Sequence, residues 1–444
     1  MSIIEQRKAL IIVDYNLSRV NDVKTIRDYA ARQHNLLTVL VRPNPLKHDF
    51  DIADYVIDAD PLVSEFVERA RAQLVELPCS LVAGLVFSDN AIVQGARLLE
   101  SLQLPCDSSE LAVNAFCKYR YRETENTLKP LLNAQSIFVP AVAEIHNRKT
   151  LKSFVDAHGN GVVIKPKAEG NNRGVILLRN PSVAEIDSAL EEVAPYMASG
   201  VIVEECIPYL DEYSYDGIGG RYFITEKFST KGRYPVEFGQ LVPAVVSQDR
   251  HQAIVRAGRA ANLLVGQNHG AFHNEILVAE DNSKAGSVEP NRRPAGMKIW
   301  SLASRVFDQN LYEQWVDSAL GYVNSEGMLA TNAGAMMVML PAPRDMYRTE
   351  LREDIGFYVE LLHQQFAQQF PQYSNTIIWS DYEPVAPPMQ RIYSPPRDNG
   401  DFLASVVLTS SDGAQVLKDV FAAIQDMWRA TIDQQLFDES IKSA

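Results

Sequence analysis

Apolar and polar positions in the first ninety residues alternate between short continuous runs and helical segments. Continuous apolar runs at 8–15, 36–41, 54–58 and 81–87 predict buried strands. Helices are predicted at 21–34 and 62–77, the second from apolar residues at helical spacing. Strands that alternate with helices of this length predict a parallel sheet covered by helices.

The turn after the first strand argues against one common use of such a sheet. Tyr15, Asn16, Leu17 and Ser18 stand where a dinucleotide-binding protein would have a glycine-rich loop. Without that loop the backbone cannot approach a pyrophosphate closely. A dinucleotide-binding role therefore loses its main support.

Shorter apolar runs dominate the rest of the chain. Two strands are predicted at 162–167 and 175–178, one at 201–208 and two more within 221–246. The methionine-rich run 335–340 predicts a buried strand rather than a metal or cofactor site. The tail has proline clusters, a predicted strand at 402–408 and an amphipathic helix at 413–436, which together predict an accessory subdomain.

Residues 271–296 concentrate candidate chemistry on two predicted strands joined by a turn-rich loop. A period of two places Glu275 on the same face as His273, and it places Glu289, Asn291 and Arg293 together on one face. Carboxylate and amide oxygens suit Mg²⁺, and a neighbouring guanidinium suits phosphate oxygens. The alternative is a solvated edge hairpin, because charged residues often alternate on strands.

Two further segments have features of a nucleotide site. Lys165 ends an apolar run and is followed by a turn with Gly, Asn and Arg173, which predicts a hairpin over an anion. A plain hairpin with a solvated tip is the simpler alternative. Glu204 enters an extended segment where it could accept from the amine of adenine, and Glu212 could accept from ribose hydroxyls.

Composition and charge narrow the class of partner. The chain has 444 residues, 46% hydrophobic and 22% charged, with a formal net charge of −14. This length predicts two to four domains or subdomains. The negative charge and the lack of a basic patch argue against nucleic acid or an anionic membrane as partner, so anions must be bound by a few placed cations and N–H groups.

The cysteines and the N-terminus predict a cytoplasmic location. Cys79, Cys106, Cys117 and Cys206 lie far apart without metal spacing, as expected of free thiols in a reducing compartment. The first apolar run is too short for a signal peptide. No window approaches the roughly 20 apolar residues of a membrane span.

Charged residues recur in a characteristic order from Lys118 to Arg293. Lys118, Lys165, the loop 169–174, the Glu204-Glu205 pair and Glu212 precede Glu275 and the E-x-N-x-R signature at 289–293. This order resembles the ATP-grasp superfamily, and the signature is its most specific part. The run TEKFSTKGRYPVEFGQLVP at 225–243 and HNE at 273–275 are similar to the carboxylate–amine ligase branch, which includes bacterial L-amino-acid ligases and dapdiamide-type amide ligases. The resemblance covers about residues 8–320, with a weaker match near 398–435.

The resemblance implies an α/β and α+β architecture, the ATP-grasp fold. An N-terminal parallel α/β domain is expected at 1–112 and an ATP-grasp domain at 113–330. Within the latter, a small lid subdomain that covers ATP is expected at about 140–205. A C-terminal accessory α+β subdomain is expected at 331–444.

The resemblance also assigns roles to individual residues. Metal ligands would be Glu275, Glu289 and Asn291, holding two Mg²⁺ ions that Mn²⁺ could replace. ATP would be held by Lys118, Lys165, Glu169, Asn171, Arg173, Gly174, Glu204, Glu205, Ile207 and Glu212. Catalytic residues would be Arg293, Lys165 and Glu289, and His273 would face the substrate.

The implied function is ATP- and Mg²⁺-dependent ligation of a small-molecule acid to an amine through an acyl phosphate, giving a dipeptide or similar amide. A homodimer is also expected. Alternatives within enzymes are a ligase for a natural-product acid that is not an amino acid, or a carboxylating enzyme similar to biotin carboxylase. A different class, a nucleotide-binding protein without catalysis, is disfavoured because both lysines and all three metal ligands are present.

Two departures from the family pattern lead to structural expectations. The loop EGNNRG has fewer glycines than most family members, which bears on how it closes over ATP. Pro290 and Pro294 each lack an N–H, so the strand between them should lie at a sheet edge or face the cleft.

Overall fold

The N-terminal part of the chain is a parallel sheet covered by helices, as predicted. The structure is a computed structural model that describes residues 6–170, 172–322 and 326–443. Its first sheet has the order β3-β2-β1-β4, and β1 runs parallel to both neighbours. The strands are β1 (Arg7–Val13), β2 (Leu37–Arg42), β3 (Tyr55–Asp58) and β4 (Cys79–Val86). The associated helices are η1 (Leu17–Arg19), α1 (Val20–His34), α2 (Asp49–Ile52), α3 (Phe66–Leu74), η2 (Asp89–Ala91) and α4 (Ile92–Ser101).

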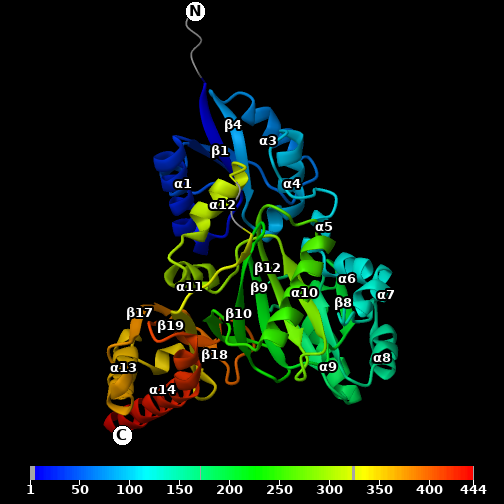
Figure 1. Ribbon diagram of the computed structural model, residues 1–444. Helices are drawn as coiled ribbons and strands as arrows, with labels where there is room; N and C mark the ends of the chain where they lie inside the picture. The colour runs from blue at the N-terminus through cyan, green and yellow to red at the C-terminus, as the bar shows by residue number, and fades with distance from the viewer. Residues whose placement is uncertain (1–5, 171, 323–325, 444) are drawn as a thin grey trace, which may run out of the picture.

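A connecting helical segment leads to a small antiparallel sheet. The helices are α5 (Ala112–Phe116), α6 (Lys118–Thr127) and α7 (Lys129–Ala134). The sheet has the order β5-β8-β6-β7, formed by β5 (Val142–Ile145), β6 (Val162–Pro166), β7 (Ile176–Leu178) and β8 (Val201–Glu205). Its helices are α8 (Arg148–Ala157), α9 (Val183–Val193) and η3 (Ala194–Tyr196). Figure 1 shows this unit at the lower right of the molecule.

A large, mainly antiparallel sheet forms the centre of the molecule. Its order is β13-β12-β9-β10-β11-β15-β19-β17, with β14 beside β10. The strands are β9 (Asp211–Ile218), β10 (Arg221–Ser229), β11 (Glu237–Val242), β12 (Ala271–Val278), β13 (Ala285–Asn291), β14 (Gly327–Met328), β15 (Gly334–Pro341), β17 (Ile377–Pro384) and β19 (Phe402–Ser410). β13 is the edge strand, which confirms the position expected from Pro290.

The C-terminal residues extend this central sheet. β15, the predicted methionine-rich strand, is buried along its whole length and pairs with β11 on one side and β19 on the other. The remaining C-terminal elements are β16 (Met346–Tyr347), η4 (Arg348–Glu350), α13 (Gly356–Gln369), η5 (Pro371–Tyr373), β18 (Arg391–Ile392) and α14 (Ala414–Ser443). Figure 1 shows α13 and α14 together at the lower left.

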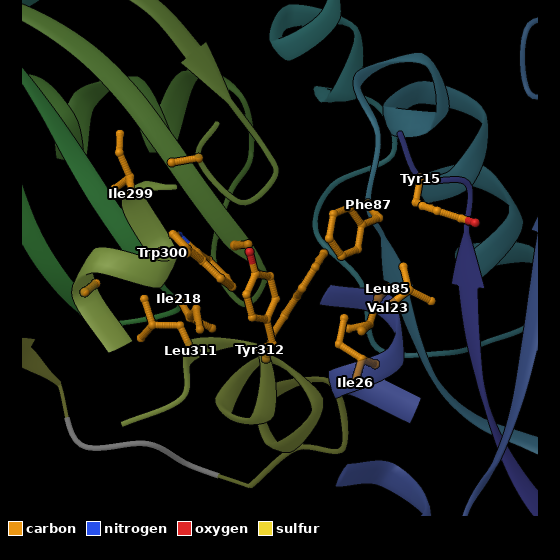
Figure 2. Packing of buried hydrophobic residues seen from close by; sticks show 14 of the residues in the cluster. Tyr15, Val23, Ile26, Leu85, Phe87, Ile218, Ile299, Trp300, Leu311 and Tyr312 are labelled. Carbon is orange, nitrogen blue, oxygen red and sulfur yellow. The ribbon is translucent and has the colours of Figure 1, made fainter. Parts of the chain in front are cut away.

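One apolar core joins the N-terminal sheet to the central part of the molecule. Phe87, just after β4, stacks on Tyr312 with ring centroids 6.3 Å apart and tilts against Trp315 at 5.4 Å. Figure 2 shows Tyr312 between Phe87 and Trp300. Tyr312 and Trp315 belong to α12 (Leu311–Ala319), which packs on α1 and β4. A shared core of large aromatic side chains gives the two parts a defined relative position.

Two helix boundaries position residues of the site and the core. The backbone of Cys117 is extended and separates α5 from α6, so Lys118 is the first residue of α6. Asp308, which has a positive φ, lies between α11 (Ile299–Val306) and α12. Helix α10 (Gln248–Leu264) packs on β9, β12 and β13 of the central sheet. No helix among the described residues is long and apolar enough to cross a membrane.

Candidate functional site

The predicted metal ligands lie on adjacent strands at the edge of the central sheet. β12 and β13 pair antiparallel, with Glu275 opposite Glu289 and His273 opposite Asn291. Opposite residues in an antiparallel pair point to the same face. These four side chains and Arg293 line one cavity of about 830 Å³, which we call the polar cavity. The structure therefore brings the predicted metal and catalytic residues of this hairpin together, while their individual roles stay predictions.

Arg293 lies just beyond the end of β13 and is held by three acceptors. Its Nε donates to Asp89 Oδ1 at 2.6 Å, and its two terminal nitrogens donate to Asn291 Oδ1 at 3.2 Å and to Pro294 O at 3.1 Å. Burial would lower the pKa of Arg293, but Asp89 together with Glu289 and Glu275 outweighs burial and raises that pKa. The guanidinium is thus a fixed positive charge in the polar cavity.

A second cavity, of about 1000 Å³, adjoins the first; charged residues contribute to its lining, but most of its surface is apolar, and we call it the apolar cavity. The predicted nucleotide residues that line it are Lys165, Glu204, Glu205, Ile207 and Glu212. Residues lining both cavities include Lys118, Glu237, Glu275 and Glu289. A pocket with a mainly apolar surface that shares lining residues with a charged one suits a ligand with an aromatic base and an anionic chain.

Lys118 stands where the two cavities meet. Its Nζ is 3.0 Å from Glu289 Oε1 and donates to the backbone oxygen of Glu169 at 2.7 Å. Burial would lower the pKa of Lys118, but Glu289 together with Asp89 and Glu204 outweighs burial and raises that pKa. Lys118 is therefore a cation at the junction, as expected of a phosphate-binding lysine, although that role stays a prediction.

Glu204 and Lys165 form a buried ion pair beneath the apolar cavity. Glu204 is 2.9 Å from Lys165 Nζ and 3.1 Å from Arg122 Nε. Burial alone would raise the pKa of Glu204, yet Arg122 and Lys165 lower it to about 2. Since two cations already hold this carboxylate, the predicted contact of Glu204 with adenine would require one of these bonds to be exchanged. The contact of Glu204 with adenine and the contact of Lys165 with phosphate both stay predictions.

The loop after β6 lies over the polar cavity and is fixed at several points. Glu169 receives the bond from Lys118 through its backbone and pairs with Arg173 at 2.9 Å through its side chain. Gly174 has a φ of +70°, and a Cβ there would lie 2.8 Å from the ring of Tyr196. A glycine is therefore required at 174. Asn171, also assigned to ATP binding, lies outside the described residues.

The comparisons with known proteins decide the fold. No protein-family model matches the chain. An L-amino acid ligase from Bacillus licheniformis superposes with a TM-score of 0.70 at 15% identity, covering 95% of this chain and 98% of that one. The ADP complex of purK, an N5-carboxyaminoimidazole ribonucleotide synthetase, gives 0.64 at 13% identity, covering 96% and 98%. The chain has the ATP-grasp fold.

The matches to two curated relatives cover a smaller part of the chain than the matches to solved structures do. An alanine–anticapsin ligase from Bacillus subtilis (strain 168) is 23% identical over 303 residues, 61% of this chain and 61% of the relative. A D-alanine–D-alanine ligase from Geobacter sulfurreducens is 24% identical over 228 residues, 50% of this chain and 68% of the relative. The match thus spans about three fifths of the first of these proteins.

A buried lysine that the sequence analysis did not assign organises the acidic side of this ATP-grasp site. The ammonium of Lys227 contacts Glu237, Glu275 at 2.7 Å and Glu212 at 3.2 Å. Burial would lower the pKa of Lys227, but Glu237 and Glu275 hold it well above its usual value. One sequence signal could have indicated this cluster. Lys227 lies in the middle of a predicted strand, between Thr225 and Ser229, and a lysine buried there needs carboxylate partners.

His273 connects the predicted metal ligand Glu275 to a buried aspartate. Its Nδ1 is 2.6 Å from Asp216 Oδ1 and its Nε2 is 3.4 Å from Glu275 Oε1. Burial would lower the pKa of His273, but Asp216 together with Glu275 outweighs burial and raises that pKa to about 9. His273 lines the polar cavity, and its two contacts make it a residue that positions Glu275; that it faces a substrate stays a prediction.

Replacing His273 by Gln should remove a stabilisation that depends on pH. Because the pKa is about 9 in the fold and near 6.5 when unfolded, the stabilisation is fully present below pH 6.5 and is lost as pH rises through 9. We expect the variant to be less stable by about 2 kcal/mol at pH 6, and by less at pH 9. Urea unfolding at both pH values measures this, with exposed His146→Gln as control. A difference that is the same at both would contradict the assignment.

The oxygen ligands of the polar cavity fit Mg²⁺. Glu275, Glu289 and Asn291 offer only carboxylate and amide oxygens, the donors that this ion prefers. Glu212, Glu237 and Glu275 also bring carboxylate oxygens within 4.8 Å of one another. The ammonium of Lys227 contacts all three carboxylates of that second group but only Glu275 in the first, so the first group is the better candidate.

Proposed function

We propose that the chain is an ATP- and Mg²⁺-dependent ligase that joins a carboxylate to an amine through an acyl phosphate. The acid is an amino acid or acyl-amino acid and the amine is an amino acid, which gives a dipeptide or similar amide, ADP and phosphate. ATP first phosphorylates the acid. The lone pair of the amine then attacks the acyl carbon, the bond to phosphate breaks, and the nitrogen loses a proton.

One observation carries the proposal. Glu275, Glu289 and Lys118 line both cavities, while Asn291 and Arg293 lie beside them in the polar cavity. A nucleotide with its base in the apolar cavity would therefore present its phosphates to two cations and three oxygen ligands. The acid would bind in the part of the polar cavity that the phosphates leave open, on the same face of the sheet.

The charged residues supply most of what this reaction requires from a protein. Negative charge builds on the transferring phosphoryl group, and Lys118 and Arg293 lie where they would offset it. Glu275, Glu289 and Asn291 would hold Mg²⁺, which neutralises phosphate charge when bound. Lys165 would contact phosphate from the other side of the junction. Binding the acid beside the nucleotide supplies further acceleration through orientation.

The loop that carries Glu169, Arg173 and Gly174 would exclude water. An acyl phosphate hydrolyses if water reaches it, so a cover over the polar cavity protects the intermediate. The bond from Lys118 to the backbone of Glu169 connects this loop to the junction of the cavities. Closure of the loop and the presence of phosphate are therefore expected to be coupled.

The relatives support the same reading. The alanine–anticapsin and D-alanine–D-alanine ligases are named for joining alanine to a second molecule, and the fold covers nearly the whole of a solved L-amino acid ligase. ADP is bound in the purK structure that shares the fold. A cytoplasmic location is part of the proposal, and the four cysteines are free thiols, as that compartment requires. The homodimer rests on the resemblance alone.

The direct test is ADP formation from ATP and Mg²⁺ with the twenty amino acids, alone and in pairs, with mass spectrometry of the products. We expect ADP release that needs a pair of substrates and yields a new amide mass. ADP without an amide would indicate a different acid or amine. Binding of ATP without release for any pair would support a nucleotide-binding protein instead.

A further inference from the structure

A carboxylate from the N-terminal domain enters the polar cavity. Asp89 begins η2, directly after β4, and its Oδ1 accepts the 2.6 Å bond from Arg293 Nε across the boundary between the two parts of the chain. Its side chain remains 38% exposed and lines the polar cavity with Glu289 and Asn291. Asp89 is therefore an accessible negative charge beside the cation predicted to bind phosphate.

The position of Asp89 is defined by the residues before it. Phe87 is buried in the shared core against Tyr312 and Trp315 (Figure 2). Ser88 donates from its hydroxyl to the buried carboxylate of Asp14. With both preceding residues anchored, the carboxylate of Asp89 is held at the cavity rather than on a mobile rim.

A negative charge at this place is unfavourable for an acid substrate unless the substrate carries a positive charge of its own. Like charges a few ångströms apart repel by about 1 kcal/mol even in water and by more in a partly closed cavity. The phosphates of ATP and the carboxylate of the acid would both approach Asp89. A substrate with an ammonium group next to its carboxylate removes this penalty, because Arg293 and Asp89 then face charges of opposite sign.

We propose that Asp89 binds the ammonium group of the acid that becomes activated, and so selects an acid with a free α-amine over one that is acylated or lacks the amine. The inference rests on the proposed function and narrows its acid substrate. An ion pair favours the protonated form of the amine, which has no lone pair for attack. The nitrogen that forms the amide therefore comes from the second substrate, and the activated residue becomes the amino-terminal part of the product.

The test compares acids with and without the ammonium in wild type and Asp89→Asn. L-alanine, L-leucine and L-phenylalanine are compared with the acids that lack only the amino group, which are propionate, isocaproate and hydrocinnamate in that order. N-acetyl-L-alanine is tested as the acylated acid. Hydroxylamine serves as the amine, and ADP and hydroxamate are measured. For the amino acids we expect kcat/KM to fall by about 30-fold or more in the variant. For the acids without the amine the fall should be at least about tenfold smaller, because these acids lose only the effect of the Asp89–Arg293 bond.

Two further variants test whether Asp89 recognises the ammonium group of the substrate or only holds Arg293 in position. Asp89→Glu keeps the charge and should retain part of the preference for amino acids, whereas exposed Asp51→Asn should change nothing. If Asp89→Asn lowers kcat/KM equally for both acids of a pair, the residue only braces Arg293 and the inference is wrong. A wild-type enzyme that forms ADP as well with propionate as with alanine would overturn it too. If wild type forms ADP with none of the twenty amino acids, the proposed function fails with it.

Discussion

Replacing Glu289 by Gln should lower kcat for ADP formation by about 100- to 1,000-fold. The amide keeps the size of the side chain but removes a charge that faces both cavities and pairs with Lys118 at 3.0 Å. A neutral side chain would hold Mg²⁺ poorly and would leave Lys118 without its carboxylate partner. Initial rates of ADP formation with a productive acid–amine pair measure the effect.

The matched control is Glu280→Gln, an exposed residue in the turn that follows β12. ADP binding without Mg²⁺, measured by calorimetry, should change little in Glu289→Gln, because the proposed site for the base is the apolar cavity. Full turnover in the variant would show that the metal assignment at β13 is wrong. Loss of nucleotide binding together with loss of folded protein would indicate a structural role instead.

Replacing Lys227 by Met should destabilise the fold by about 3–5 kcal/mol at pH 7.5. Methionine has a similar length and no charge, so Glu212, Glu237 and Glu275 lose the ammonium they share. Removing one partner of a buried ion pair leaves the other charge uncompensated. Urea unfolding measures the change, with exposed Lys284→Met as control.

Lowering the pH should narrow the difference between Lys227→Met and wild type. In wild type, burial would raise the pKa of Glu275, but Lys227 and His273 hold it well below its usual value, so its stabilising contribution is lost only as pH falls below about 4.5. In the variant, burial prevails for Glu275 and Glu237 and raises the pKa of both, so their protonation stabilises the fold as pH falls. We expect a smaller difference at pH 5.5 than at 7.5. An equal or larger difference at pH 5.5 would contradict the role of Lys227 as their shared cation.

Local pattern predicted much of the site because the chemistry lies on two strands close in sequence. A period of two was enough to place Glu275 and His273 on one face of the first strand, and Glu289 and Asn291 on one face of the second. The pairing of β12 with β13 brings these two faces to the same side of the sheet. Pro290 within β13 and Pro294 just after it likewise predicted a strand at a sheet edge or facing the cleft, since a proline has no N–H to donate to a neighbouring strand. Patterns of this kind depend only on neighbours along the chain.

The partners of these residues were decided by tertiary structure. Asp89 reaches Arg293 across 204 positions, and Lys227 meets Glu275 across 48. Periodicity states which way a side chain points but not which distant strand or helix faces it. The helix break at Cys117, which makes Lys118 the first residue of α6, was also invisible to apolar spacing.

The sequence by itself therefore determined the architecture of the N-terminal sheet, the hairpin with its oxygen ligands and the resemblance to the ATP-grasp superfamily. Only the tertiary structure decided that three carboxylates share one buried lysine, that Glu204 is held by two cations, and that the N-terminal domain supplies a carboxylate to the cavity. The physical reason is that the energy of a buried charge depends on every charge around it, whichever part of the chain brings that charge there.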